Sequence, residues 1–238
     1  MNNSIDELLR ANAYPGRGII LGLSGDGNRS VLVYFIMGRS MNSRNRVFER
    51  TSDGIRTKAH DPGKMVDPSL VIYHPVRVFG GRTIVTNGDQ TETIYEYLAS
   101  GQDFHSALQT REFEPDPPIY TPRISGLAES DRSYHLSILK TAGGDPARCC
   151  RFFFEFSEPV PGSGHFISTY KSDGNPPPSF EGEPVPVSID VDNGLEHFAR
   201  SVWSALNEDN KVSLYARETV IATGEMFDII INKNMETI

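Results

Sequence analysis

Residues 71–91 read VIYHPVRVFGGRTIVTNGDQT, and this stretch decides the fold around it. The Gly80-Gly81 pair supplies the positive φ angles that a tight hairpin turn requires. The segments on either side, 71–79 and 82–86, contain the β-branched and aromatic residues that favour strands. The stretch therefore predicts an antiparallel hairpin within a larger sheet.

The second predicted strand runs into the loop Asn87-Gly88-Asp89-Gln90-Thr91, and a helical pattern follows over 91–100. A glycine-containing loop at a helix N-terminus presents free N–H groups, which suit an anion or a carbonyl oxygen. An ordinary strand–helix junction with Asp89 or Thr91 as N-cap explains the same residues. Other parts of the chain must decide between these two interpretations.

The flanking sequence predicts a layered α+β fold. Residues 17–23 and 30–37 are apolar strands joined by a turn, and we expect them in the middle of a sheet. Asp192 is expected to cap the most amphipathic helix, which extends to Leu206. Further strands are predicted at 46–50, 54–59, 133–139, 148–156, 165–170, 185–190, 212–219 and 225–231, and further helices before Arg10, over 91–100 and over 103–111. About ten strands with few helices fit stacked antiparallel sheets with helices on their outer faces.

Length and composition bound the domain organisation and the class of partner. The chain has 238 residues, 38% of them apolar, and nothing in its composition marks a linker, so we expect one domain over 1–238. Residues 1–13 form an N-terminal extension, and the proline-rich segment 171–186 a surface excursion. The formal net charge of −8 excludes a general nucleic-acid binder. Without a signal peptide or a membrane-length apolar run, the sequence predicts a soluble cytoplasmic protein.

Several common kinds of site lack their sequence pattern. The only cysteines, Cys149 and Cys150, are adjacent and point to opposite faces of a strand, and the six histidines show no zinc spacing, so no metal site is expected. A nucleophile elbow is absent. The glycines of 22–27 lie in a turn between strands rather than before a helix, which excludes a phosphate-binding loop of the Walker or Rossmann type.

One basic loop stands out in an acidic chain. Residues 38–46 read GRSMNSRNR directly after a buried strand. Arginine binds phosphate through two hydrogen bonds, and serine and asparagine can complete the shell of an oxyanion. The alternative is a solvated basic loop without a ligand.

Polar residues recur on successive predicted segments. The set comprises Arg17, Arg39, Ser40, Arg44, Asn45, Tyr73, Arg77, Asn87, Gly88, Asp89, Glu114, Asp116 and Arg123. These residue types favour an anionic ligand with many hydrogen-bonding groups.

Five motifs in this order resemble the archaeal-type IMP cyclohydrolase family. They are YPGR at 14–17, GRSMNSRNR at 38–46, IYHPVRV at 72–78, VTNGDQT at 85–91 and YTPRISG at 120–126. The resemblance covers about 14–126 well and is weaker over the C-terminal half. It implies the four-layer αββα sandwich of the N-terminal nucleophile hydrolases, without autoprocessing. It also implies closure of the ring of 5-formamidoimidazole-4-carboxamide ribonucleotide to IMP, with a purine nucleotide as the small-molecule partner and no cofactor. No nucleic acid or membrane is expected as a partner. The sequence leaves open whether the protein forms a homo-oligomer.

The resemblance implies roles for the polar set. Arg39, Ser40, Arg44 and Asn45 would bind the phosphate and ribose, with Arg17 and Asp89 completing the substrate-binding residues. Tyr73 would transfer a proton or stabilise an oxyanion with Arg77 or Arg17 as a cationic neighbour. Asn87 and the Gly88 backbone would orient the carboxamide or formyl group, Glu114 or Asp116 would be the acid/base, and Arg123 would pair with that carboxylate or with substrate. Arg46 is expected to belong to the next strand instead.

Two other functions fit the same residues. A relative with this fold could hydrolyse another amide or purine-like nucleotide, or the protein could bind a nucleotide without catalysis. The proline-rich C-terminal half keeps both alternatives open, because it could reshape the site or form a subunit interface.

Overall fold

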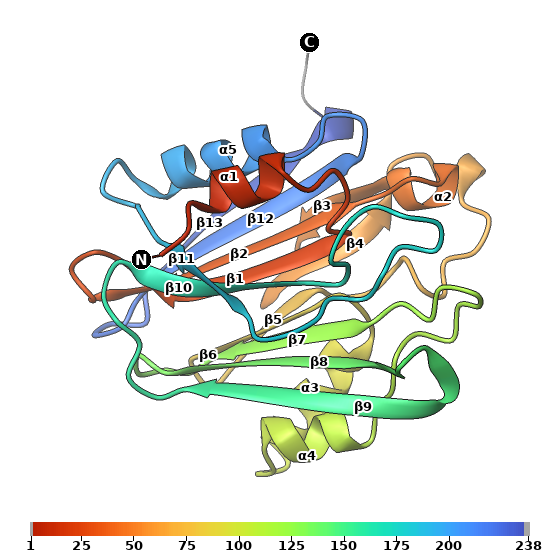
Figure 1. Ribbon diagram of the computed structural model, residues 1–238. Coiled ribbons are helices and arrows are strands. Elements are labelled where there is room, and N and C mark those ends of the chain that lie inside the picture. The colour runs from red at the N-terminus through yellow and green to blue at the C-terminus, as the bar shows by residue number, and fades with distance from the viewer. Residues whose placement is uncertain (1, 236–238) are drawn as a thin grey trace.

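The structure is a computed structural model that describes residues 2–235. Within these residues the chain is an α+β protein with thirteen strands in two antiparallel sheets. Figure 1 shows the two sheets stacked on each other, with helices on the outer sides.

The first sheet has six strands in the order β11-β10-β1-β2-β12-β13. Its strands are β1 (Arg17–Leu23), β2 (Arg29–Met37), β10 (Ser163–Ser168), β11 (Val185–Ser188), β12 (Lys211–Val220) and β13 (Met226–Asn232). The predicted apolar hairpin, β1 and β2, is confirmed in the middle of this sheet, where every residue of β1 is buried.

The second sheet has seven strands in sequence order from β3 to β9. They are β3 (Arg46–Arg50), β4 (Gly54–Ala59), β5 (Val76–Phe79), β6 (Arg82–Thr86), β7 (Arg123–Ala128), β8 (Tyr134–Ala142) and β9 (Asp145–Phe156). The predicted hairpin is β5 and β6, and its turn residues Gly80 and Gly81 have φ angles of 57° and 79°.

Tyr73 does not lie in the first strand of that hairpin, contrary to the prediction. β5 begins only at Val76, because Pro75 has no N–H to donate to a sheet. Tyr73 instead exchanges hydrogen bonds with Thr57 of β4: its backbone N–H donates to the Thr57 hydroxyl over 2.8 Å, and its carbonyl accepts from the Thr57 N–H over 2.8 Å.

Five α-helices lie within the described residues, and all of them except the short one between β2 and β3 pack on the outer faces of the two sheets. They are α1 (Ile5–Arg10), α2 (Met41–Arg44), α3 (Gln90–Ala99), α4 (Phe104–Gln109) and α5 (Leu195–Ala205), with 3₁₀ turns η1 (Pro62–Lys64) and η2 (Lys233–Met235). Three apolar clusters separate the layers: one joins α1 and α5 to the first sheet, one fills the space between the sheets, and one joins α3 and α4 to the second sheet. No helix within 2–235 is long and apolar enough to cross a membrane.

One predicted helix cap is wrong, and another is confirmed in position only. Asp192 does not cap α5, because Gly194 takes the cap position with a φ of 92° and the helix starts at Leu195. Asp89 occupies the cap position of α3, but its side chain caps no backbone N–H and forms ion pairs with arginines instead. The proline-rich segment 171–186 is mostly exposed, and Phe180 anchors it in the cluster between the sheets.

Candidate active site

Charged and phenolic side chains gather between the two sheets. Strand alternation explains three of them: Arg17 shares a face of β1 with Ile19, Tyr34 a face of β2 with Leu32, and Arg46 a face of β3 with Phe48. These apolar partners all belong to the cluster between the sheets. The folding that buries the apolar residues therefore carries two arginines and a tyrosine into the same layer.

Two tyrosines meet within this layer. The hydroxyls of Tyr34 and Tyr73 lie 2.9 Å apart, and both side chains are buried. Burial raises the pKa of Tyr34 well above its ordinary value, and the neighbouring Tyr73 raises it further. The hydrogen bonds to Thr57 fix the backbone of Tyr73, so its ring enters the layer from the segment before β5.

Arg46 is the largest completely buried side chain of the described residues. Its Nε donates to the carbonyl of Ser43 over 2.8 Å, but its two terminal nitrogens have no hydrogen-bond partner within residues 2–235. Burial lowers the pKa of Arg46, and the charge of Arg17 lowers it further. A buried guanidinium with free donors costs folding free energy, which is typical of a group that awaits an anionic or carbonyl ligand.

Arg17 and Arg123 extend this set of buried cations. Their Nε atoms also lack a partner among the described residues. Burial alone would lower the pKa of Arg17, but Glu114 and the tyrosines 170, 73 and 14 outweigh it, so that the pKa is raised. The tyrosines and Glu114 therefore lie close enough to Arg17 to act on its charge.

Glu114 is the carboxyl group of the cluster, and only 2% of its surface is exposed. Burial raises its pKa to about 7, although Arg17 and Arg123 oppose the shift. One of its oxygens accepts a weak hydrogen bond of 3.4 Å from the Asn87 amide. Near neutral pH this group can therefore exist in both protonation states, as an acid/base catalyst requires.

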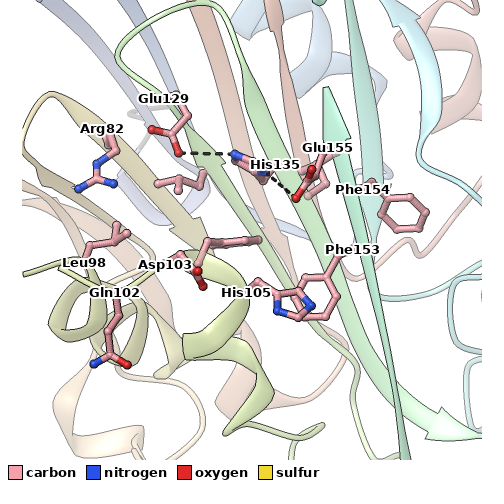
Figure 2. Close-up of a pocket in the computed structure, with 13 residues that line it drawn as sticks. Arg82, Leu98, Gln102, Asp103, His105, Glu129, His135, Phe153, Phe154 and Glu155 are labelled. Carbon is pink, nitrogen blue, oxygen red and sulfur yellow. Dashed lines mark ion pairs between the residues drawn. The ribbon is translucent and has the colours of Figure 1, made fainter. Parts of the chain in front are cut away.

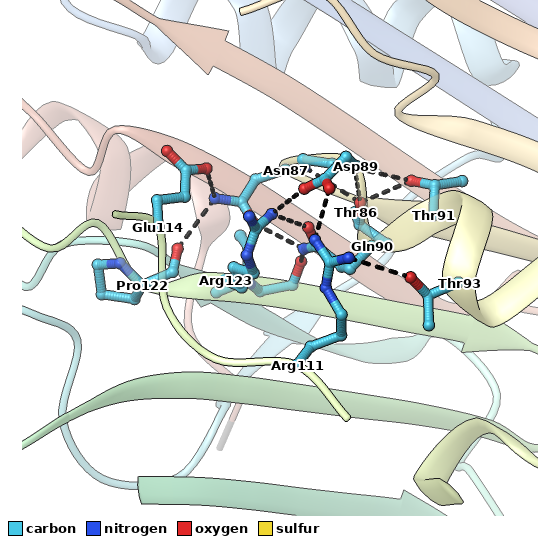
Figure 3. Close-up of polar contacts among 12 residues, drawn as sticks. Thr86, Asn87, Asp89, Gln90, Thr91, Thr93, Arg111, Glu114, Pro122 and Arg123 are labelled. Atoms are coloured by element: carbon cyan, nitrogen blue, oxygen red, sulfur yellow. Dashed lines mark hydrogen bonds and ion pairs between the residues drawn. The ribbon is translucent and has the colours of Figure 1, made fainter. Parts of the chain in front are cut away.

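The loop before α3 holds Arg123 in place (Figure 3). One terminal nitrogen of Arg123 lies 2.6 Å from the side-chain oxygen of Gln90 and 2.6 Å from a carboxylate oxygen of Asp89. Arg111 binds the other carboxylate oxygen of Asp89 over 2.5 Å. Asp89 thus neutralises Arg123 from the exposed side. Burial alone would raise the pKa of Asp89, but Arg111 and Arg123 outweigh burial, so the pKa of Asp89 is below its ordinary value.

Asn87 and Gly88 support this loop through bonds that are already complete. The Asn87 amide donates to the carbonyl of Pro122 over 2.9 Å, and its oxygen accepts from the Ile124 N–H over 2.8 Å. The Gly88 N–H donates to the hydroxyl of Thr86 over 3.1 Å. A Cβ atom on Gly88 would lie 2.5 Å from the nearest Arg123 nitrogen, so this position needs glycine for the close approach.

The predicted basic loop lies at the rim of the buried cluster. Arg39 stacks over the ring of Tyr14, 4.5 Å from its centre, and Tyr14 stacks on Tyr170. The guanidinium of Arg39 forms a 2.7 Å ion pair with Asp173, and its side chain is 35% exposed. One aromatic layer therefore separates Arg39 from the buried arginines.

The other residues of that loop have local partners. Ser40 caps α2 by accepting from the Ser43 N–H over 3.1 Å. Arg44 donates to the carbonyl of Gly38 over 2.8 Å, and the buried Asn45 amide donates to the carbonyl of Asp61 over 2.8 Å.

Two predicted catalytic residues lie away from the free donors. Arg77 follows the inward-facing Val76, so it points to the opposite face of β5, where it binds Asp53 and Glu92. The two carboxylate oxygens of Asp116 both accept from Thr121, over 2.6 Å each, which closes the loop 116–121.

The structure thus brings together Arg17, Tyr73, Glu114 and Arg123 of the predicted set, with Asn87 supporting them. Sequence reasoning missed Tyr34, Arg46 and Tyr170. The sequence did contain a signal for Arg46. It lies two residues before Phe48 on a predicted strand, so the two side chains share the face that points to the core. Nothing local marks Tyr170, whose hydroxyl lies 2.9 Å from that of Thr121.

A cavity of about 200 Å³ lies elsewhere, on the outer side of the second sheet (Figure 2). Apolar residues of α4, β8 and β9 form much of its wall, and His135 sits between Glu129 and Glu155 at 3.5 and 3.9 Å. His135 and its two glutamates pair with one another and are partly exposed, whereas the cluster between the sheets holds buried donors that have no partner among the described residues. We therefore place the candidate active site in the cluster, which is defined by Arg17, Tyr34, Arg46, Tyr73, Glu114 and Arg123.

The sequence is similar to proteins of one family. The family model described as "IMP cyclohydrolase-like protein" matches residues 14–233, well past the motifs that carry the resemblance. An IMP cyclohydrolase of Methanothrix thermoacetophila is 30% identical over 176 residues, which cover 71% of this chain and 80% of that protein. An IMP cyclohydrolase of Methanopyrus kandleri is 26% identical over 211 residues, which cover 86% of this chain and all of that protein. The chain therefore belongs to the IMP cyclohydrolase-like protein family.

Proposed function

We propose that this protein is an IMP cyclohydrolase, which closes the ring of 5-formamidoimidazole-4-carboxamide ribonucleotide to IMP with loss of water. The observation that carries the proposal is the cluster between the sheets in a chain of this family. It combines buried guanidinium donors without partners with a carboxyl group whose pKa is about 7.

The chemistry defines what such a site must do. A carboxamide nitrogen attacks a formyl carbon of the same molecule, and the formyl oxygen finally leaves as water. The amide nitrogen is a weak nucleophile and hydroxide is a poor leaving group. The protein must therefore hold the two groups together, stabilise the developing oxyanion and transfer protons.

Tyr73 and the two buried arginines suit the oxyanion. Tyr73 is among the groups that raise the pKa of both Arg17 and Arg46, which means that the phenol lies near both guanidinium groups. We assign the free terminal nitrogens of Arg46 to the formyl oxygen as it gains negative charge. Tyr73, held by Tyr34, donates a hydrogen bond to this oxygen or accepts the amide proton.

Glu114 is the better acid/base of the two predicted carboxylates. Asp116 is fully engaged with Thr121, whereas Glu114 has a single weak hydrogen bond and titrates near neutral pH. In its protonated form Glu114 supplies the proton that turns the departing hydroxide into water.

We assign the phosphate to the rim and the reacting groups to the interior. A phosphate dianion is strongly hydrated, so a half-exposed position costs less desolvation than a buried one. Arg39 is half exposed and lies one aromatic layer from the cluster, and the ion pair with Asp173 shows that it accepts an anionic partner. Phosphate would replace Asp173, with Ser40, Arg44 and Asn45 shaping the loop around it.

The layered fold supports a finer classification. We propose that the αββα arrangement is the N-terminal nucleophile hydrolase sandwich without autoprocessing. Gly16 and Arg17 stand at the start of β1, where a processed enzyme would carry a Cys, Ser or Thr nucleophile. An intact mass equal to that of the 26.4 kDa chain supports this, and a shortened chain that begins at a new N-terminus contradicts it.

The test is an absorbance assay for IMP formation from the formylated ribonucleotide, with a chelator present. Turnover above the uncatalysed rate establishes the reaction. Saturable IMP binding without turnover favours a nucleotide-binding protein, and hydrolysis of a different amide favours a related hydrolase. The absence of both turnover and IMP binding would contradict the proposal. The similarity to the family would then reflect a shared fold only.

A further inference from the structure

Strand β9 forms an open edge of the second sheet. It is the longest strand of the described residues, with 12 residues, and it pairs with β8 on one side only. Figure 1 shows it along the outer edge of the lower sheet. On its free side no backbone hydrogen bond joins residues 145–156 to another described segment.

The composition of this edge does little to protect it. Natural edge strands usually carry prolines, bulges or many charges that prevent another strand from adding to them. Residues 147–156 of β9 contain no proline, and three consecutive phenylalanines, Phe152 to Phe154, stand at the centre. Phe152 is 43% exposed. An open edge of this kind is a template to which another strand can add.

The charges around the phenylalanines make the strand complementary to itself. Residues 151–155 read Arg-Phe-Phe-Phe-Glu, so a positive charge precedes the apolar centre and a negative charge follows it. When two copies meet antiparallel around a two-fold axis at Phe153, Arg151 of each copy lies opposite Glu155 of the other. Phe152 then lies opposite Phe154, which forms aromatic cross-strand pairs.

This register differs in its charges from the registers that are centred on a charged residue of β9. Arg148 also falls opposite Glu158, two residues past the end of β9, and no like charges meet. A shift to a centre at Arg151 or Glu155 would place that charge against its own copy. A centre at Arg148 would place Arg148 against its own copy. It would also bring Pro146, which has no N–H to donate, into the paired part of the strands. Cross-strand pairs of opposite charge stabilise a sheet, and like pairs destabilise it.

The side chains that would form these pairs are accessible. Glu155 is 69% exposed, and its partner among the described residues is His135 at 3.9 Å, which keeps Glu129 as a second partner. Figure 2 shows Glu155 beside His135 at the edge of the cavity. The Arg151 side chain is 28% exposed: two of its nitrogens donate to the carbonyl of Arg111, and one of these two also lies 3.7 Å from a carboxylate oxygen of the exposed Glu112. The other terminal nitrogen of its guanidinium is left to face a second copy.

We propose that a second copy of this chain binds to the β9 edge, forming a two-fold dimer in which two seven-stranded sheets join into one continuous sheet. Main-chain hydrogen bonds supply the pairing, and the two Arg151–Glu155 pairs fix the register. The proposal does not depend on the reaction that the protein catalyses.

Light scattering coupled to size-exclusion chromatography tests this proposal. We expect the native chain at twice its 26.4 kDa mass, and we expect Arg151→Glu and Glu155→Arg each to shift the protein to the monomer mass. Each reversal places two pairs of like charges in the interface. The double variant Arg151→Glu/Glu155→Arg restores opposite pairs and is expected to return to the dimer.

Mixing the two monomeric single variants gives the sharpest result. In a mixed pair, the negative charge that Arg151→Glu introduces lies opposite the positive charge that Glu155→Arg introduces on the other copy. The unchanged Glu155 of the first copy lies opposite the unchanged Arg151 of the second, so every facing pair has opposite charges. A heterodimer is therefore expected to form, and a failure of either variant to fold cannot imitate this result.

The matched control is Arg200→Glu, which reverses an exposed arginine of α5 that pairs with Glu196, and it is expected to stay dimeric. A monomeric native chain at high micromolar concentration would overturn the proposal. Single reversals at Arg151 or Glu155 that stay dimeric would overturn it as well.

Discussion

The hydroxyl groups of Tyr34 and Tyr73 lie 2.9 Å apart, although Tyr34 stands on a central strand of the first sheet and Tyr73 is bound to the second. This contact joins the two sheets at the point where the partnerless guanidinium groups are buried. A buried hydroxyl needs a hydrogen-bond partner, so each tyrosine fixes the position of the other.

Replacing Tyr73 by phenylalanine should therefore separate catalysis from folding. We expect kcat to fall roughly 10²–10⁴-fold, because the hydroxyl that donates or accepts a proton is lost. The free energy of unfolding should fall by only about 1 kcal/mol, the net value of one hydrogen bond. Tyr34→Phe is the control, with the same loss of stability and a smaller loss of kcat. Equal effects of both variants on kcat would argue against a direct role for Tyr73.

Arg46 should show opposite effects on stability and activity. Arg46→Met keeps the length of the side chain and removes a buried charge whose terminal donors have no partner. We expect the free energy of unfolding to rise by about 1–3 kcal/mol, as when other buried charges are replaced by apolar side chains. The value of kcat should fall roughly 10²–10³-fold, the loss typical of a missing oxyanion donor. Urea denaturation and steady-state kinetics measure both, and a destabilised but active variant would contradict the assignment.

Arg39 should affect binding rather than chemistry. Arg39→Ala removes a charged donor at the rim, and we expect KM to rise roughly 10–100-fold with kcat nearly unchanged, as expected for a charge-assisted hydrogen bond worth about 1.5–3 kcal/mol. Arg200→Ala, on the exposed face of α5, should change neither constant. An unchanged KM in the Arg39 variant would remove the phosphate from this loop.

Glu114 should make the stability depend on pH. Its pKa is about 7 in the folded protein against 4.5 as its ordinary value. The folded state therefore holds a proton that the unfolded state has released, and the free energy of unfolding falls as pH rises from 4.5 to 7, by about 3 kcal/mol for this group alone. The loss is complete above the folded pKa.

The variant Glu114→Gln provides the measurement. Denaturation at several pH values between about 4 and 8 should show a smaller decrease of stability with pH than in the native protein. In this variant, kcat should no longer change with pH near neutrality as a result of the ionisation of residue 114. An identical pH dependence of stability in both proteins would show that folding does not raise the pKa of Glu114.

The sequence by itself determined much of the architecture. The Gly80-Gly81 turn, the apolar hairpin of 17–37 and the helices after Asn87 and Asp103 depend on local conformational preferences and on alternation along the chain, and the structure confirms them. The five ordered motifs also indicated the family. Local preference failed at Asp192, where a glycine with a positive φ angle starts the helix later, and at Tyr73, where a proline delays the strand.

The composition of the candidate active site depends on the tertiary structure. Arg39 and Arg46 belong to one basic stretch of the sequence, yet the first lies at the rim beside Asp173 and the second starts β3 and is completely buried. Their sequence context does not distinguish them as ligands, because an arginine shows its function only when its partners are known. Likewise, Glu114 and Asp116 are close neighbours in the sequence, and only the packing of the sheets buries one while Thr121 engages the other. Burial and pairing are properties of neighbours that are distant along the chain, so the sequence proposed the set of residues and the fold selected among them.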